Sequence, residues 1–207
     1  MRKARIAVLV SGGGTNLQAL IDAETSGRIS NGTISLVISN NAGAYALTRA
    51  GNAGIPSAVV TKKDCGGQDA FETRLIEVLE KAEIDLIILA GFMSILSARF
   101  TAHFEGRIIN IHPSLIPSFC GKGMYGLRVH EAALSYGVKV TGATVHFVNE
   151  VPDGGRIIAQ KAVAVLPDDT PETLQRRVME QAEWILLPQA AELVSAEISK
   201  KKESAES

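Results

Sequence analysis

The feature that most constrains the fold is a repeated succession of short apolar runs, each followed by a loop and a helical pattern. These runs occupy residues 4–10, 33–39, 56–60, 85–90 and 107–112. Runs that are apolar at most positions are typical of strands buried on both faces of a parallel sheet. Four or five βα units in succession therefore predict an α/β fold with a doubly wound, mostly parallel sheet. In such a sheet, ligands bind beyond the carboxyl ends of the strands.

The last third of the chain departs from this pattern. Residues 139–148 and 156–165 alternate between apolar and polar side chains, and the turn-forming segment 149–155 separates them. This arrangement predicts a late pair of antiparallel strands. A long C-terminal helix follows, which begins at the capping segment 168–172 and which Pro188 is expected to kink or interrupt.

We expect one domain over residues 1–198, because no internal repeat or composition shift marks a boundary. Residues 199–207 are charged and are expected to form a frayed tail. Earlier in the chain, an apolar stripe predicts an amphipathic helix over residues 71–82. The expected solvent face of this helix carries Glu72, Glu77, Glu80 and Lys81.

The charge balance narrows the possible partners. The 207 residues include 21 basic and 22 acidic side chains, for a net charge of −1, which does not favour nucleic acid or a membrane surface as a partner. No apolar stretch approaches the ~20 residues that cross a bilayer, and the first apolar run is shorter than the core of a signal peptide. Cys65 and Cys120 form neither a disulfide framework nor a zinc-binding spacing. We expect a cytoplasmic protein that needs no metal.

A glycine-rich turn follows the first predicted strand. Ser11, three glycines, Thr15 and Asn16 precede a helical pattern, and this layout directs backbone N–H groups at an anion. A phosphate is the expected ligand. The turn matches neither the triphosphate-binding P-loop nor the full dinucleotide fingerprint, because position 17 is leucine. The alternative is a tight turn between strand and helix that binds nothing.

Two polar side chains interrupt the apolar run at 107–112. Asn110 and His112 are two residues apart, so on a strand they project to the same face. An amide can donate to a developing oxyanion, and an imidazole can move a proton near neutral pH. The pair therefore predicts a reaction centre, unless both residues only bond the backbone of nearby loops.

Two residues and one loop have two interpretations each. Asp153 is either a turn residue or a carboxylate that holds a His112 imidazolium. His146 is either catalytic or a histidine at the edge of the core that bonds backbone. The loop at 91–96 is unusually apolar for a surface connection, so it lines a pocket for a flat apolar ligand or packs under the next helix.

Five motifs carry a resemblance that covers residues 4–195. They are VLVSGGGTNLQALI, LAGFMSIL, INIHPSLIPSF, TGATVHFV and DGG. With them, the sequence resembles the phosphoribosylglycinamide formyltransferases, or GAR transformylases, of purine biosynthesis. The resemblance implies a Rossmann-like formyltransferase fold and formyl transfer from 10-formyltetrahydrofolate to the glycinamide amine of 5-phosphoribosylglycinamide. It also implies small-molecule substrates, this folate as the formyl-donor cosubstrate, and a monomer or homodimer.

The resemblance assigns roles to individual residues. The catalytic positions are Asn110, His112 and Asp153. The positions that contact phosphoribosylglycinamide are Gly13, Gly14, Thr15, Asn16 and Glu183. The match at Glu183 needs a one-residue insertion. The positions that contact folate are Gln68, Met93, Ser94, Ile95, Leu96 and Asn110.

Some positions depart from the family pattern. Gln68 and Ser94 stand where several relatives have arginines near the folate, so the charge contribution to folate binding is open. The side chains that could substitute are Lys62, Lys63 and Arg74. Trp184 stands where a histidine is common, and the segment 120–134 is slightly longer than in many relatives.

Three other functions compete with this one. Hydrolysis of 10-formyltetrahydrofolate is the nearest, but such hydrolases usually carry an N-terminal regulatory domain, and we expect none because the first strand starts near Ala4. A methionyl-tRNA formyltransferase would normally add an RNA-binding domain, and the chain is not basic. A non-catalytic phosphosugar-binding module would explain the glycine-rich turn but leave Asn110, His112 and Asp153 without a purpose.

Overall fold

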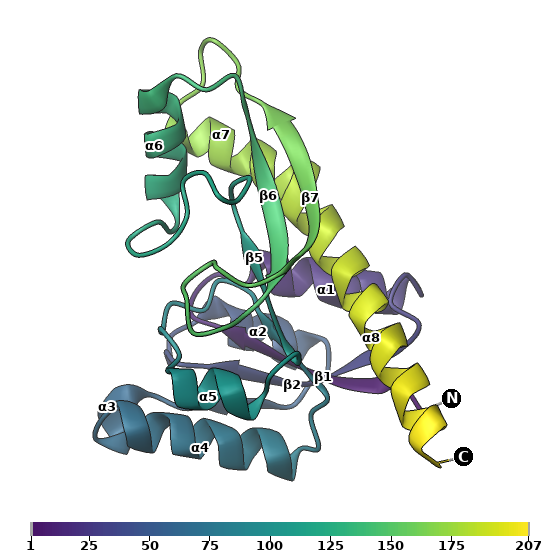
Figure 1. Ribbon diagram of the computed structural model, residues 1–207. Coiled ribbons are helices and arrows are strands. Elements are labelled where there is room, and N and C mark those ends of the chain that lie inside the picture. The colour runs from purple at the N-terminus through teal and green to yellow at the C-terminus, as the bar shows by residue number, and fades with distance from the viewer. Residues whose placement is uncertain (1, 207) are drawn as a thin grey trace.

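The computed structural model describes residues 2–206. Its centre is a seven-stranded sheet in the order β3-β2-β1-β4-β5-β6-β7, with helices on both faces (Figure 1). The strands are β1 (Ala4–Val10), β2 (Gly32–Ser39), β3 (Ser57–Val59), β4 (Leu86–Leu89), β5 (Ile108–His112), β6 (Val140–Phe147) and β7 (Ile157–Ala164). Neighbours among β1 to β5 pair in parallel, whereas β6 is antiparallel to both β5 and β7. The predicted doubly wound sheet with late antiparallel strands is confirmed.

The helices cover the two faces of the sheet. They are α1 (Thr15–Thr25), α2 (Tyr45–Asn52), α3 (Lys62–Cys65), α4 (Gln68–Lys81), α5 (Ala98–His103), α6 (Leu127–Tyr136), α7 (Pro171–Val178) and α8 (Trp184–Glu206). A π-helical turn, η1 (Met179–Glu183), joins α7 to α8. The predicted C-terminal helix is therefore interrupted about one turn before Pro188, and Pro188 itself lies inside α8. Proline removes an N–H and crowds the carbonyl four residues earlier, here that of Trp184, directly after η1.

Successive side chains of a strand point to opposite faces of the sheet, so the core has two layers. On β1, Ile6, Val8 and Val10 face the layer under α1, α2 and α8. Ala7 and Leu9 face the layer under α4 and α5. Because both faces of β1 are covered, the strand needs apolar residues at every position, and burying each large side chain contributes about 1.5–3 kcal/mol.

The strand order places the ligand crevice. The chain runs from β1 outward to β3 and then returns to β4 on the other side of β1. The loops that leave β1 and β4 therefore flank the point where the order reverses. These loops touch, because the Met93 N–H donates to Ser11 Oγ at 2.8 Å. The loop that leaves β2 also joins them, because Asn40 Nδ2 donates to Ser94 Oγ at 2.8 Å.

The C-terminal tail differs from the sequence expectation. Instead of fraying after residue 198, α8 continues to Glu206. Ser199 is buried and donates to the Arg2 carbonyl at 3.2 Å, and Lys202 Nζ pairs with Asp85 Oδ1 at 2.6 Å. These contacts reach the N-terminal ends of β1 and β4, which a local charge pattern cannot show.

Glu72 also differs from the expectation, because it does not face solvent. Its side chain is fully buried and accepts from the Ser97 N–H at 2.7 Å, from the Ser97 hydroxyl and from Gln68 Nε2 at 2.5 Å. Gln68 Nε2 also donates to the Ile95 carbonyl at 3.1 Å. Helix α4 is therefore tied to the loop that follows β4.

Candidate active site

The carbonyls of the glycine-rich turn are hydrogen-bonded to the protein, which sets the direction of its amides. Gly14 begins α1 in the left-handed conformation, with φ of 71°, and no side chain caps the helix. Helix α2 holds the turn from behind, where Ala46 N–H donates to the Gly12 carbonyl at 3.0 Å and Arg49 Nε donates to the Gly13 carbonyl at 2.9 Å. The N–H of a trans peptide points away from its carbonyl. The amides of Gly13 and Gly14 therefore point away from α2, where an anion can bind together with the first amides of α1.

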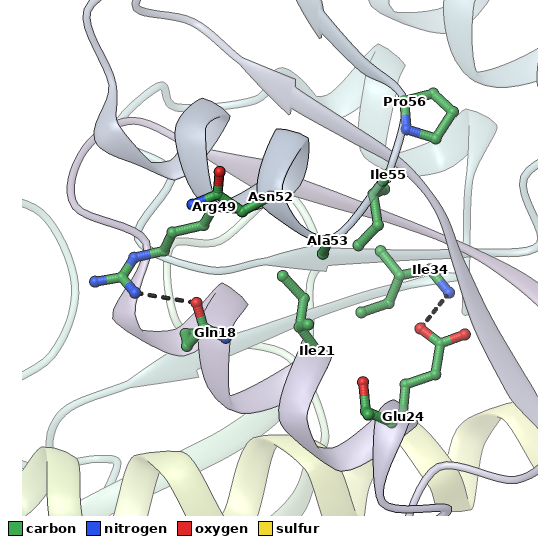
Figure 2. A pocket seen from close by; sticks show the side chains of 11 residues that line it. Gln18, Ile21, Glu24, Ile34, Arg49, Asn52, Ala53, Ile55 and Pro56 are labelled. Carbon is green, nitrogen blue, oxygen red and sulfur yellow. Dashed lines mark hydrogen bonds between the residues drawn. The ribbon is translucent and has the colours of Figure 1, made fainter.

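A hollow of about 590 Å³ lies between α1 and α2 (Figure 2). Three of its polar side chains, Gln18, Glu24 and Arg49, bond other parts of the protein. Arg49 Nη1 donates to Gln18 Oε1 at 3.0 Å, and Glu24 Oε2 accepts from the Ile34 N–H at 3.1 Å. These contacts stabilise the turn and strand β2.

A second cavity, of about 470 Å³, lies at the carboxyl ends of the strands. The predicted site residues that line it are Asn16, Met93, Ser94, Ile95, Asn110, His112, Asp153 and Glu183. They come from α1, the loop after β4, strand β5, the turn before β7, and η1. Residues far apart in the sequence are thus brought to one place.

The other predicted residues are not among those that line this cavity; they are Gly13, Gly14, Thr15, Leu96 and Gln68. Leu96 lines an adjoining pocket of about 140 Å³ together with Asn110 and Asp153. Thr15 lines a neighbouring hollow beside Trp184. Gln68 is not among the residues that line the cavity, and it reaches the loop after β4 through its bond to the Ile95 carbonyl.

Asp153 lies between two imidazoles. Its Oδ2 is 3.5 Å from His112 Nδ1, and its Oδ1 is 3.5 Å from His146 Nε2. Asn110 and His146 pair across β5 and β6, which brings Asn110 Nδ2 to 3.2 Å from His146 Nε2. Asp153 has a positive φ of 56°, which is typical of a turn residue. Its contacts with both imidazoles place its carboxylate at the site as well.

Backbone carbonyls fix the proton positions of both imidazoles, because a carbonyl can only accept a hydrogen bond. His112 Nε2 donates to the Phe119 carbonyl at 2.9 Å, which leaves Nδ1 facing Asp153. His146 Nδ1 donates to the Phe147 carbonyl at 2.8 Å, which leaves Nε2 facing Asn110 Nδ2 at 3.2 Å and Asp153 Oδ1 at 3.5 Å.

Burial and charge set the protonation states of these groups. Burial lowers the pKa of His112, and the Asp153 charge and the bond to the Phe119 carbonyl only partly oppose this. Burial alone would raise the pKa of Asp153, but the bond to His146, the charge of His112 and the Gly121 N–H together hold it below its usual value. The imidazole is therefore mostly neutral and the carboxylate ionised near neutral pH.

Glu183 is buried on η1 beside α1. Its Oε2 accepts from Asn16 Nδ2 at 2.6 Å. Burial raises the pKa of this carboxyl, and the Asn16 bond opposes the rise. A π-turn such as η1 can take in one extra residue without unwinding the helix, which is compatible with the one-residue insertion that the resemblance implies.

Sequence reasoning missed His130. It lies on α6, is fully buried, and forms part of the cavity wall. A single histidine in a short helical pattern gives no signal that separates it from an ordinary core residue. Gln175 of α7 and Met179 of η1 also line the cavity, and sequence reasoning missed them for the same reason.

Two general properties of the described residues bear on the site. Over residues 2–206, no helix combines the length and the apolar character needed to span a membrane. In the same range, no three histidine, cysteine or acidic side chains are grouped so that they could hold a metal ion.

The family profile described as formyl transferase matches residues 4–190. The chain belongs to the formyl transferase family. The phosphoribosylglycinamide formyltransferase of Haemophilus influenzae, a relative, is 45% identical over 177 residues, which cover 86% of this chain and 81% of the relative. The human trifunctional purine biosynthetic protein adenosine-3 is 48% identical over 94% of this chain, which spans only 19% of that protein.

Solved structures agree with this family assignment. The crystal structure of glycinamide ribonucleotide transformylase 1 from Symbiobacterium toebii has a TM-score of 0.87 and 43% sequence identity, and the match covers 94% of this chain and 88% of that one. The fold and the family that the sequence motifs implied are thereby confirmed.

Proposed function

We propose that this formyl transferase moves a formyl group from 10-formyltetrahydrofolate to the glycinamide amine of 5-phosphoribosylglycinamide in purine biosynthesis, as a cytoplasmic enzyme. The observation that carries the proposal is the convergence, around one cavity, of Asn16 directly after the glycine-rich turn, the Asn110–His112–Asp153 set and a buried glutamate. The names of the relatives described above support the choice of substrates.

The ribonucleotide would bind along the side of the cavity formed by α1 and η1. Its phosphate would accept from the amides of Gly13, Gly14 and Thr15, where the helix dipole also favours a negative charge. Its amine would lie near Glu183 and Asn16. A carboxyl with a raised pKa can take a proton from an ammonium group, which would leave the amine neutral and nucleophilic.

The folate would bind against the loop after β4. Met93 and Ile95 are 53% and 66% exposed, which is unusual for apolar side chains, and a flat pteridine would cover them. Gln68 and Ser94 would support this loop through their bonds to the Ile95 carbonyl and the Asn40 amide, rather than through charge.

The chemistry would follow from the positions of three side chains. The amine attacks the formyl carbon, a C–N bond forms, and the carbonyl oxygen becomes an oxyanion to which Asn110 Nδ2 donates. The amine nitrogen then loses one proton and the folate nitrogen gains one, as its bond to the formyl carbon breaks. His112 Nδ1, beside Asp153, would carry this proton.

The test is to follow release of tetrahydrofolate from 10-formyltetrahydrofolate, with and without 5-phosphoribosylglycinamide. We expect rapid release only when the ribonucleotide is present. Equal rates in both reactions would indicate a hydrolase. Binding of both ligands by calorimetry without any release would indicate a binding module.

A further inference from the structure

We propose that His130 is a substrate-binding residue whose imidazole forms a hydrogen bond with an uncharged group of the ribosylglycinamide, either a sugar hydroxyl or the glycinamide amide. The inference rests on the proposed function and adds a residue to it. His130 is fully buried, and neither of its ring nitrogens has a hydrogen-bond partner among residues 2–206. The residue nevertheless lines the active-site cavity.

The other histidines of the chain all have partners. His103 contacts Glu80, His112 contacts Phe119, and His146 contacts Phe147. Buried polar groups in proteins are nearly always hydrogen-bonded, so a wholly unpaired imidazole on a cavity wall indicates that a ligand supplies the partner. Asn16 Oδ1, on a residue that lines the same cavity, is also buried and unpaired.

The position of His130 favours the ribonucleotide over the folate. Helix α6 packs against α7 (Figure 1), whose continuation carries Met179 and Glu183 on the same cavity wall. The Thr15 hydroxyl lies 3.9 Å from Met179 Sδ, which connects this wall to the glycine-rich turn. A ligand with its phosphate on that turn and its amine near Glu183 would place its ribose along this wall.

The charge state of His130 narrows the group that it binds. Burial, together with the charge of His112, lowers the pKa of His130 to about 4. At neutral pH the ring is therefore uncharged, with one N–H donor and one nitrogen acceptor. Such a ring suits a hydroxyl or an amide and does not attract a phosphate.

The experiment compares His130→Leu, His130→Gln and the control His103→Leu, whose histidine is exposed on α5. KM is measured for each substrate in turn, and the melting temperature is recorded. We expect His130→Leu to raise KM for the ribonucleotide about tenfold, equivalent to about 1.4 kcal/mol, and to change KM for the folate less than about twofold. Its melting temperature should not fall, because no protein hydrogen bond is lost. His130→Gln should recover part of the affinity, and His103→Leu should behave as wild type.

An unchanged KM for the ribonucleotide in His130→Leu, or equal increases for both substrates, would overturn the inference. Histidine-¹⁵N NMR separates this result from a failure of the proposed function. If the wild type shows no transfer but 5-phosphoribosylglycinamide shifts the His130 ring signals, the reaction is wrong and the binding role stands. If transfer is normal and these signals do not move, only the role of His130 fails.

Discussion

Replacing Asp153 by asparagine keeps the shape of the turn and removes one charge from the site. Asp153 Oδ2 lies 3.5 Å from His112 Nδ1. At an effective dielectric constant of ~20, two unit charges at that distance attract by about 5 kcal/mol, which is an upper bound. Carboxylate–cation pairs of this kind usually shift a pKa by roughly 1–3 units. Because Asp153 raises the pKa of His112 against the effect of burial, Asp153→Asn should lower that pKa further.

The assay is an NMR titration of the His112 imidazole in wild type and variant, together with the pH dependence of kcat. The pH at which His112 gains its proton should move towards acid, and the limb of the kcat profile that reports His112 should move with it. Turnover at pH 7 should fall about a hundredfold, since general acid–base assistance contributes ~10²–10⁴. Asp168→Asn removes an exposed charge in the loop before α7 and serves as the control.

Either of two results would refute this reasoning. If the His112 pKa stayed constant in a folded Asp153→Asn protein that retained normal turnover, Asp153 would act only as a turn residue. A rise in the His112 pKa would contradict the sign of the interaction itself.

Three further predictions concern single residues. Asn110→Ala should lower kcat by about a hundred- to a thousandfold, because one oxyanion donor is lost, with little change in the melting temperature; near-normal turnover would exclude Asn110 as the donor. Gly14→Ala should weaken phosphoribosylglycinamide binding by calorimetry more than folate binding, because its Cβ would lie 2.6 Å from Ala46 Cβ at a φ of +71°. Gly12→Ala has room for a Cβ and should keep the wild-type melting temperature. Asp169→Asn should cost about 1–2 kcal/mol of unfolding free energy at pH 7, because Arg177 bonds both carboxylate oxygens at 2.5 Å and holds the pKa of Asp169 well below its usual range. Since the folded-state pKa is depressed, urea titrations should show this difference narrowing as the pH falls below about 4.

The parts of the fold that follow from local patterns could be predicted from the sequence. Strand β1 is apolar at nearly every position because both of its faces are buried, whereas β7 carries polar residues because it is largely exposed. Asn110 and His112 could be paired because a spacing of two along a strand is independent of the rest of the fold.

The parts that depend on distant partners could not be predicted. Glu72 is buried because Ser97, on another element, supplies its hydrogen bonds. The role of His146 depends on the register between β5 and β6, which places it opposite Asn110. Asp153 reaches the site only because the β6–β7 turn folds back over β5, and the spacing of turn residues carries no information about that direction.

The π-turn at Met179–Glu183 sets how the buried side of α8 is rotated relative to the buried side of α7. An α-helix advances about 100° per residue, so one extra residue would rotate the buried side of α8 away from the sheet if η1 were α-helical. Because η1 takes in that residue, Val178 before it and Leu187 after it both remain fully buried. The cavity thus gains the carboxylate of Glu183 without a change in how α8 packs. Deleting one residue within η1 should therefore preserve both helices and turn Glu183 away from Asn16.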